Sequence, residues 1–470
     1  MAPAAPRRRF DLAVLLSFGA LVLVLATVAL LVLDLRERRR LERHLRFADV
    51  EDEARFFEEA ATYAALRRRV LDGYVEPVES RELLLDALDG GVRALDPHSR
   101  LIRPEDQAAV EEQARGEYHG IGVRIDRAEP ALTVLYPLEG SPADLAGLRP
   151  GDRILRIDEE ELGPEDHQHG VEILKGRGNT RVLLRVINAE EPDAPPRVVE
   201  AWRQPVPEPA VRHPRPLRSG RVGYVALTGF TPQTKLELLR AMDQLQLAGA
   251  RSFVLDLRQN GGGSYDAAIE CARLFVPHGT IVSERRRGLE TEVVRAIPAE
   301  ARFAGIPLAV LVDRATASAA EILAGALQDH GLAVLLGERT YGKGVVQSTQ
   351  QITQLIDGLT LGLRLTTEYY FTPLGRNFES RGAGTHGGGL LPDLLVPSEE
   401  SAIARVRAWM DDLDIPEKHR EAVERLSVRS GRPALDERIL EEDQLVLAAL
   451  ELLDSSTAVA LRLPRPLLQR

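Results

Sequence analysis

Residues 308–328 read LAVLVDRATASAAEILAGALQ, an apolar stretch, a short polar turn and a second apolar stretch. Leu308 to Val312 is a continuous apolar run of strand length, and Ala319 to Gln328 is rich in helix-forming apolar residues. A strand that leads through a short turn into a helix is the repeating unit of α/β proteins. This stretch therefore predicts one unit of a mainly parallel sheet.

The same alternation extends on both sides of this unit. Hydrophobic periodicity predicts two further strands and two further helices, at Val222–Leu227, Arg251–Leu257, Gln233–Leu247 and Ala267–Phe275. Residues 221–398 are accordingly predicted to form one α/β core, and residues 399–470 a helical C-terminal region.

Towards the N-terminus the pattern changes twice. Residues 35–115 carry apolar side chains at helical spacing and are predicted to be a helical cap, broken at Asp96-Pro97 because the residue before proline avoids the α region. Residues 116–204 alternate in the manner of short strands joined by glycine turns. Residues 205–220 are rich in proline and are interpreted as a linker.

An uncharged apolar run extends from Leu12 to Leu33 behind the basic tip Arg7 to Arg9. At about 1.5 Å per residue it is long enough to cross the ~30 Å hydrocarbon core of a bilayer. A cleaved signal peptide is the alternative, but the run ends in bulky residues instead of a small-residue cleavage site. Residues 1–34 are predicted to be a basic tip and an uncleaved single-pass anchor.

The basic residues on the two sides of the apolar run give opposite predictions for the orientation of this anchor. Arg36, Arg38 and Arg39 begin a second basic cluster directly after the apolar run. The positive-inside rule counts both flanks, so this cluster favours a cytoplasmic body while the N-terminal arginines favour the opposite.

Composition restricts the class of partner. Lys plus Arg is 60 and Asp plus Glu is 71, which gives a net charge of −11. No basic surface of the size that nucleic acid requires is implied, so no nucleic-acid partner is expected. The single cysteine, Cys271, excludes an intramolecular disulfide and any multi-cysteine metal site.

Glycines mark a candidate peptide-binding loop in the strand-rich segment. Gly120-Ile121-Gly122-Val123 leads into a strand, and Ser141-Pro142-Ala143 and Gly151-Asp152 follow in order. Backbone N–H groups of such a loop can converge on a carboxylate, and the adjacent strand edge can accept an extended peptide. The alternative is that the glycines only make turns. The order of these blocks resembles a PDZ domain, which implies that Gly120, Ile121, Gly122 and Val123 cradle a protein C-terminus.

Three further segments carry candidate chemistry. The first, residues 256–263, reads DLRQNGGG directly after a predicted strand. Its glycines would let backbone N–H groups face a developing anion. Phosphate binding is the alternative, but the lysine and Ser/Thr of a P-loop and the GxGxxG spacing are absent.

The second segment places Ser318 at the junction of a strand and a helix, near the positive end of the helix dipole. A helix N-cap is the simpler interpretation of such a serine. In the third segment, Lys343 stands between Gly342 and Gly344, with Gln347 four residues on. A solvated turn lysine is the simpler interpretation, but burial would lower the lysine pKa and let a neutral amine act as a base. Across one turn, Gln347 could orient that amine.

Together these segments resemble the C-terminal processing peptidases, or tail-specific proteases. The family pattern has a DLRxNxGG turn, an SAS-type nucleophile segment and a GKGxxQ segment about 25 residues later. This chain shows each in order, with flanking likeness at Leu95-Asp96-Pro97-His98-Ser99 and Asp443-Gln444-Leu445. The chain departs from the pattern at Thr316, where serine is frequent, and at Gly261, where proline is frequent.

The resemblance implies a protease core with a crotonase-like or ClpP-like αβ sheet, an inserted PDZ domain and helical terminal parts. It implies Ser318 as nucleophile, Lys343 as general base and Gln347 as the orienting residue. The oxyanion hole would use the N–H of Ala319 and one of Gly262 or Gly263. The reaction is peptide hydrolysis through an acyl-enzyme, with no metal and no cofactor.

Two alternatives remain at this level. A Ser-His-Asp enzyme is disfavoured because His278, His330 and His386 lie in no GxSxG context. A catalytically weak PDZ adaptor on the same scaffold would have lost the serine or the lysine, and both are retained. The resemblance also implies a body outside the cytoplasmic membrane, substrates bound by their C-termini and a possible homo-oligomer.

Overall fold

The computed structural model describes residues 50–454, except for residues 105, 108–109, 111–116, 127–130, 164–165, 189–190, 192, 208, 357–358, 380–387, 398–399 and 431–438. The predicted anchor Leu12–Leu33 and the histidine His386 lie outside these described residues. Within them, none of the helices combines the length and the apolar character needed to cross a membrane.

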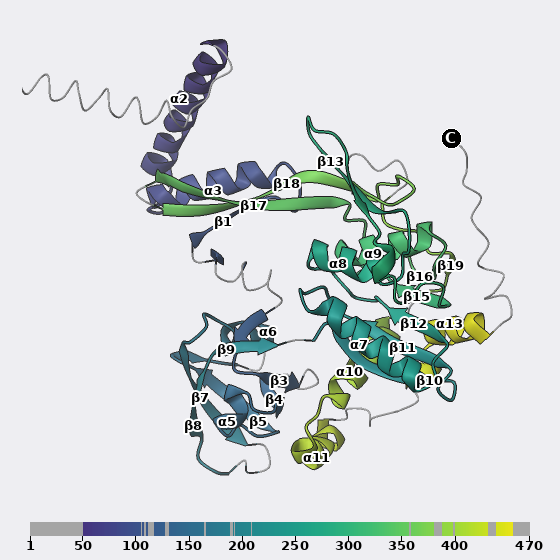
Figure 1. Ribbon diagram of the computed structural model, residues 1–470. Helices are drawn as coiled ribbons and strands as arrows, with labels where there is room; N and C mark the ends of the chain where they lie inside the picture. The colour runs from purple at the N-terminus through teal and green to yellow at the C-terminus, as the bar shows by residue number, and fades with distance from the viewer. Residues whose placement is uncertain are drawn as a thin grey trace, which may run out of the picture. The chain divides into compact units, whose positions relative to one another are not determined.

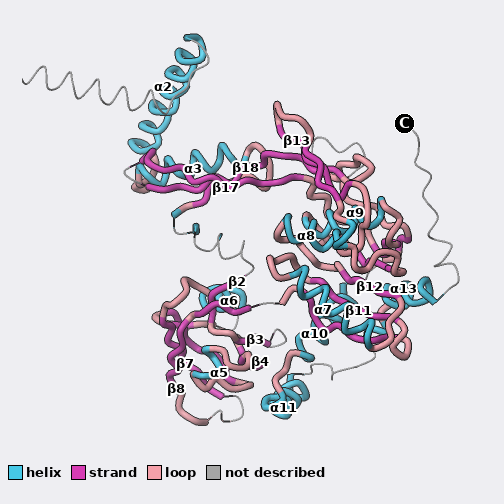
Figure 2. Tube along the Cα trace, viewed as in Figure 1, coloured by secondary structure: helices cyan, strands magenta, loops and turns pink. Residues whose placement is uncertain are grey.

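The chain divides into two compact units between Gly90 and Gly91. Helix α2 (Val50–Gly73) lies in the first unit, and helix α3 (Ser80–Arg93) begins there. Both match the helices predicted on this side of Asp96-Pro97. Every strand among the described residues lies in the second unit (Figures 1 and 2).

The α/β core predicted from the alternating pattern is confirmed. One sheet has the strand order β10-β11-β12-β15-β16-β19, and all its neighbours are parallel except the β10–β11 pair. The strands are β10 (Val211–Leu217), β11 (Val222–Leu227), β12 (Ser252–Asp256), β15 (Leu308–Val312), β16 (Val334–Gly337) and β19 (Leu394–Leu395).

Helices cover both faces of this sheet, as a largely parallel sheet requires. Phe253 and Leu255 of β12 pack in one apolar cluster and Val254, between them, packs in the other. The first cluster includes α7 (Thr234–Leu247), α8 (Tyr265–Arg273) and α9 (Ala319–Asp329), and the second includes α10 (Glu400–Leu413), α12 (Ile439–Glu442) and α13 (Gln444–Asp454). Burial on both faces explains why these strands read as continuous apolar runs.

A second sheet was not anticipated from the sequence. It is built on the long hairpin of β17 (Val345–Ile356) and β18 (Leu359–Phe371), with β1 (Arg100–Ile102), β13 (Thr280–Arg286) and β14 (Glu292–Arg295). Strand β17 occupies one edge of β18, while β1 and β13 share the other edge. Strand β1 lies inside the segment predicted to be a helical cap, because the chain becomes extended after Pro97 and pairs with β18.

The strand-rich segment forms a small domain of its own. Its sheet has the order β3-β4-β5-β7-β8, with β6 beside β5, and a separate pair joins β2 to β9. The elements are β2 (Glu117–Gly120), β3 (Val123–Asp126), β4 (Thr133–Pro137), α5 (Pro142–Leu145), β5 (Asp152–Ile157), β6 (Glu160–Glu161), α6 (His167–Leu174), β7 (Arg181–Asn188), β8 (Arg197–Trp202) and β9 (Gln204–Pro207).

The proline-rich stretch 205–220 differs from the linker that its composition suggested. It supplies most of β9 and all of β10, which connect the small domain directly to the core sheet. Proline is compatible with both strands because each lies at the edge of its sheet, where one side of the backbone needs no partner.

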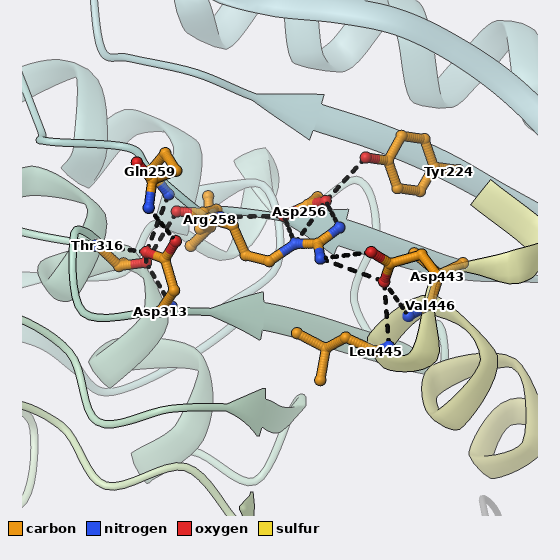
Figure 3. Close-up of polar contacts among 10 residues, drawn as sticks. Tyr224, Asp256, Arg258, Gln259, Asp313, Thr316, Asp443, Leu445 and Val446 are labelled. Atoms are coloured by element: carbon orange, nitrogen blue, oxygen red, sulfur yellow. Dashed lines mark hydrogen bonds and ion pairs between the residues drawn. The ribbon is translucent and has the colours of Figure 1, made fainter. Parts of the chain in front are cut away.

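A buried charge network joins the C-terminal helix α13 to strand β12 (Figure 3). Arg258 forms ion pairs with Asp256 at 2.7 Å and with Asp443 at 2.9 Å, and all three side chains are buried. Tyr224 donates its hydroxyl hydrogen to Asp256. Asp443 also accepts the N–H groups of the first turn of α13, so the C-terminal region is held by the same arginine that begins the glycine turn.

Replacing Asp443 by alanine is therefore expected to lower the free energy of unfolding by about 3 kcal/mol, since it breaks a buried ion pair and removes a helix cap. This loss of stability lies near the lower end of the range for broken buried ion pairs, because Arg258 still forms its ion pair with Asp256. Asp454→Asn is the matched control: it weakens a more exposed pair with Arg218 at the other end of α13 and should cost ~1 kcal/mol or less. Equal losses in urea unfolding of the two variants would contradict this role for Asp443.

Candidate active site

Ser318 occupies the N-cap of α9 in an unusual backbone conformation. Its φ is 57° and its ψ is −119°, a strained combination for a residue with a Cβ. The N–H of Ser318 donates to Oε2 of Glu321 at 2.8 Å. The N-cap position agrees with the simpler interpretation of this serine, but the strain, which typically costs ~1–3 kcal/mol, is more than capping a helix requires.

The glycine turn that follows β12 lies against this serine. A Cβ added to Gly262 would lie 2.8 Å from Ser318 Cβ and 3.0 Å from the backbone nitrogen of Ala319, so only glycine fits there. Asp313 fixes the turn to the nucleophile segment, because it accepts hydrogen bonds from the N–H and the side chain of Gln259 at 2.9 and 2.6 Å (Figure 3).

The three predicted oxyanion donors differ in their availability. The N–H of Gly262 already donates to Oδ1 of Asn260 at 2.9 Å. The N–H groups of Ala319 and Gly263 have no acceptor among the described residues. Ala319 and Gly263 are therefore the better-supported donors, and the oxyanion hole itself stays a prediction.

Lys343 lies on a loop that is joined to the serine segment through its backbone. Tyr341 donates its N–H to Thr316 O at 3.0 Å, and Gly344 donates its N–H to Glu379 at 2.9 Å. The Lys343 side chain is half-buried. Burial, reinforced by the positive charge of Arg364, lowers the pKa of the Lys343 ammonium, as a lysine acting as a base requires.

Glu321 is the residue that sequence reasoning missed. Its fully buried carboxyl group accepts N–H groups from Ser318 at 2.8 Å, Gly342 at 2.8 Å and Lys343 at 2.9 Å, and it contacts the hydroxyl of Thr340. One side chain thus holds both candidate catalytic residues. Burial raises the Glu321 pKa to about 7 against the opposing effect of these hydrogen bonds. The Ser-x-x-Glu spacing from Ser318 to Glu321 is that of a capping box and could have drawn attention to this residue.

Tyr370 of β18 also contacts the loop of Lys343. Its hydroxyl donates to the backbone oxygen of Lys343, and the Ser318 side chain exerts a small lowering effect on its pKa. Complete burial holds the Tyr370 pKa well above its usual range, so the hydroxyl keeps its proton. Among the described residues, no hydrogen bond joins Ser318 Oγ to Lys343 Nζ.

The reasoning that assigned Gln347 needs correction. A spacing of four residues brings side chains together only in a helix, whereas the chain from Val345 onward is strand β17. The amide of Gln347 lies 3.5 Å from Val345 O and 3.5 Å from Thr366 Oγ1, and no described hydrogen bond connects it to Lys343. Its orienting role stays a prediction without that premise.

The turn at residues 96–99 is a further feature without a predicted role. Asp96 accepts the N–H groups of His98 and Ser99 at 2.7 and 2.8 Å, and the Ser99 hydroxyl at 2.7 Å. Ser99 Oγ in turn accepts the N–H of Thr366 on β18. The negative charge of Asp96 acts on Lys343 and raises its pKa, opposing the larger effect of burial.

The predicted peptide-binding loop has the geometry of a held turn beside an open strand edge. Gly122 has φ of 71°, and its carbonyl oxygen accepts the N–H of Leu138 at 2.9 Å and the hydroxyl of Ser141 at 2.8 Å. Ile121 is buried beneath the loop. Val123 begins β3, which pairs only with β4 in the described sheet, so its other edge could accept a peptide strand.

Comparison with known proteins agrees with this arrangement. The model of peptidase family S41 matches residues 221–396, and a PDZ domain model matches residues 133–188. A carboxyl-terminal-processing protease of Picosynechococcus sp. is 36% identical over 341 residues, which cover 71% of this chain and 78% of that protein. A carboxy-terminal-processing protease of Bartonella bacilliformis is 31% identical, covering 73% and 76%.

Among solved structures, a photosystem II D1 C-terminal processing protease is 30% identical, covers 71% of this chain and 86% of its own, and superposes with a TM-score of 0.42. The identity and mutual coverage of the curated relatives decide the assignment. The chain belongs to the carboxyl-terminal-processing proteases of peptidase family S41, which are serine-type hydrolases, and it carries a PDZ domain.

Proposed function

We propose that this protein is an endopeptidase that cleaves through a Ser318–Lys343 dyad and an acyl-enzyme. The observation that carries the proposal is the shared carboxyl group of Glu321, which receives the backbone N–H of both residues. A strained serine at a helix N-terminus and a half-buried lysine with a lowered pKa are thereby fixed on adjacent loops. The parallel core sheet with α9 behind it supports the expected crotonase-like or ClpP-like arrangement.

The chemistry follows from these two groups. Neutral Lys343 Nζ takes the proton from Ser318 Oγ as that oxygen attacks the peptide carbonyl carbon, and the N–H groups of Ala319 and Gly263 stabilise the tetrahedral anion. The C–N bond then breaks, and the lysine gives its proton to the leaving amine. Water hydrolyses the ester with the same lysine as base. Incubation with a peptide that has an apolar C-terminus, comparing wild type with Ser318→Ala, tests the proposal.

The PDZ domain is proposed to capture substrate C-termini and to gate the active site. Helix α11 (Arg420–Ser430) packs on strand β4, where Val423 and Tyr136 are both buried. Lys418 forms an ion pair with Asp144 at 2.7 Å, and Asp144 also accepts the N–H of Gly140 in the turn that grips Gly122. The C-terminal helical region therefore contacts β4 and α5, beside the turn that holds Gly122.

A variant that breaks the contact between α11 and β4 distinguishes a PDZ domain that gates the active site from one that only binds substrate. Val423→Asp places a charge in the buried contact and is expected to change kcat for peptide cleavage by roughly threefold or more if the domain gates, because a small bias shifts a two-state equilibrium. Val428→Asp on the same helix is the matched control, since Val428 is 85% exposed. A Val423→Asp protein with altered KM alone would leave docking as the only role.

Anchoring in the cytoplasmic membrane, with the body outside, is a proposal from the sequence. It rests on the apolar run Leu12–Leu33 and on the extracytoplasmic placement implied by the family resemblance. Protease added to intact spheroplasts is expected to digest the body of the protein. Protection of the body until the cells are lysed would place it in the cytoplasm.

A further inference from the structure

A cleft of about 940 Å³ extends to Val345, two residues after Lys343, and to Glu379, which accepts the N–H of Gly344. It is lined by the turn at residues 93–98, by residues 285–289 at the end of β13, by residues 365–369 of β18, and by Val345 and Glu379. Its floor is a gap in the second sheet. On one edge of β18, strand β1 pairs up to Arg364 and β13 pairs from Glu368 onward, so among the described residues no strand lies on that edge between them, where Thr366 donates its N–H to Ser99.

The acidic side chains of this cleft are all engaged by the protein itself. Asp96 binds the backbone and hydroxyl of its own turn, with bonds of 2.7 to 2.8 Å. Glu368 forms an ion pair with Arg286. Glu379 is buried and accepts the N–H of Gly344. These carboxylates therefore have little remaining capacity to bind a cationic ligand.

Two arginines of the cleft, unlike these carboxylates, are available to bind a ligand. Arg285 and Arg287 are exposed, and neither has an ion-pair partner among the described residues. The Arg285 guanidinium lies over the ring of Phe371, 4.9 Å from its centroid, which limits its orientations while leaving its N–H donors unpaired. Leu95 and Leu289, which are 67% and 61% exposed, add apolar surface to the same cleft.

We propose that this cleft is a substrate subsite that binds an acidic side chain close to the scissile bond, with Arg285 and Arg287 as specificity-determining residues. The inference rests on the proposed dyad, because the cleft is assigned to substrate by its lining residues Val345 and Glu379, which adjoin the Lys343 loop. A guanidinium offers several N–H donors in a planar fork that matches a carboxylate. The apolar rim is suited to an aliphatic residue beside the acidic one.

Matched peptides test this specificity. Each pair differs by Asp against Asn at one position near the cleaved bond, and each is made with a free and with an amidated C-terminus. Wild type is expected to cleave one Asp peptide roughly fivefold more efficiently than its Asn partner, through KM, as one exposed ion pair allows. The ratio should fall towards one in high salt. A preference that follows the terminal carboxylate instead of the side chain would overturn the proposal.

Variants assign the preference to the arginines. Arg287→Ala and Arg285→Ala should each reduce the Asp/Asn ratio, mainly by raising KM for the Asp peptide, and Arg287→Glu should bring the ratio below one. Arg251→Ala is the control, because Arg251 is exposed directly before β12, at the opposite end of that strand from the glycine turn. A wild-type ratio in both alanine variants would overturn the subsite. A different result would show that the dyad assignment itself is wrong: the Ser318→Ala variant would still cleave every peptide.

Discussion

Ser318→Ala and Lys343→Ala are each expected to reduce kcat for peptide cleavage by about 10⁴-fold or more, the scale found when the nucleophile or base of a hydrolase is removed. The folded protein should be little changed, because the hydrogen bonds that hold both residues involve their backbone N–H groups, which alanine retains. The measurement is turnover of a peptide with an apolar C-terminus, beside thermal unfolding. Lys235→Ala, which removes a lysine of α7 that forms an ion pair with Glu300, is the control and should keep its activity.

The pH profile distinguishes a base from a merely positive charge. A protonated Lys343 cannot accept the Ser318 proton, so the rate should rise with pH through the lysine pKa, which burial and Arg364 place below the ordinary 10.5. Lys343→Arg should be inactive across this range, because guanidinium is not deprotonated in proteins. Activity of the arginine variant near that of wild type would exclude the dyad.

The core was predictable because its signal is local. A strand buried on both faces, such as Leu308–Val312, must be continuously apolar, and the sequence shows this directly. The β17–β18 hairpin was missed for the opposite reason. Its strands mix polar and apolar residues, as in Val345–Ile356, and their pairing with the distant strands β1 and β13 leaves no local pattern.

The candidate site was likewise predictable only where its signal is local in the sequence. Motif spacing indicated Ser318 and Lys343, and the structure places their loops together through the Tyr341–Thr316 hydrogen bond. The roles of Glu321 and Tyr370 could not be predicted, because each depends on contacts between segments far apart in the chain. The argument for Gln347 assumed helical spacing from Lys343, but the chain there is a strand. Spacing in the sequence identifies neighbouring side chains only when the secondary structure is known.

Replacing Glu321 is expected to lower both the stability and the activity of the protein, although we propose no direct chemical role for its carboxyl group. In Glu321→Ala, the N–H groups of Ser318, Gly342 and Lys343 lose their acceptor in a buried site. Each unsatisfied group costs ~1–3 kcal/mol, so the free energy of unfolding should fall by about 3–5 kcal/mol. Because the loops of both catalytic candidates would shift, kcat should also fall by roughly 10² or more.

Gln328→Ala separates the two effects. Gln328 lies on the same helix, is equally buried, and bonds to Leu391 O at 2.9 Å, away from the dyad. It should destabilise the protein without a comparable loss of kcat at a temperature where both variants are folded. A Glu321→Ala protein that is destabilised but turns over at the wild-type rate would show that the carboxyl group only supports the fold.

Glu321 also makes a prediction for stability against pH. Its pKa of about 7 in the folded protein lies above the ordinary 4.5, so the folded state binds this proton more tightly than the unfolded state does. The resulting stabilisation is complete below pH ~4.5 and is lost as the pH rises through 7. Glu321→Gln cannot titrate, so the stability of wild type relative to this variant should decline across that window in urea unfolding. A constant difference from pH 4.5 to 7.5 would mean that the carboxyl group is already ionised throughout, held by its hydrogen bonds.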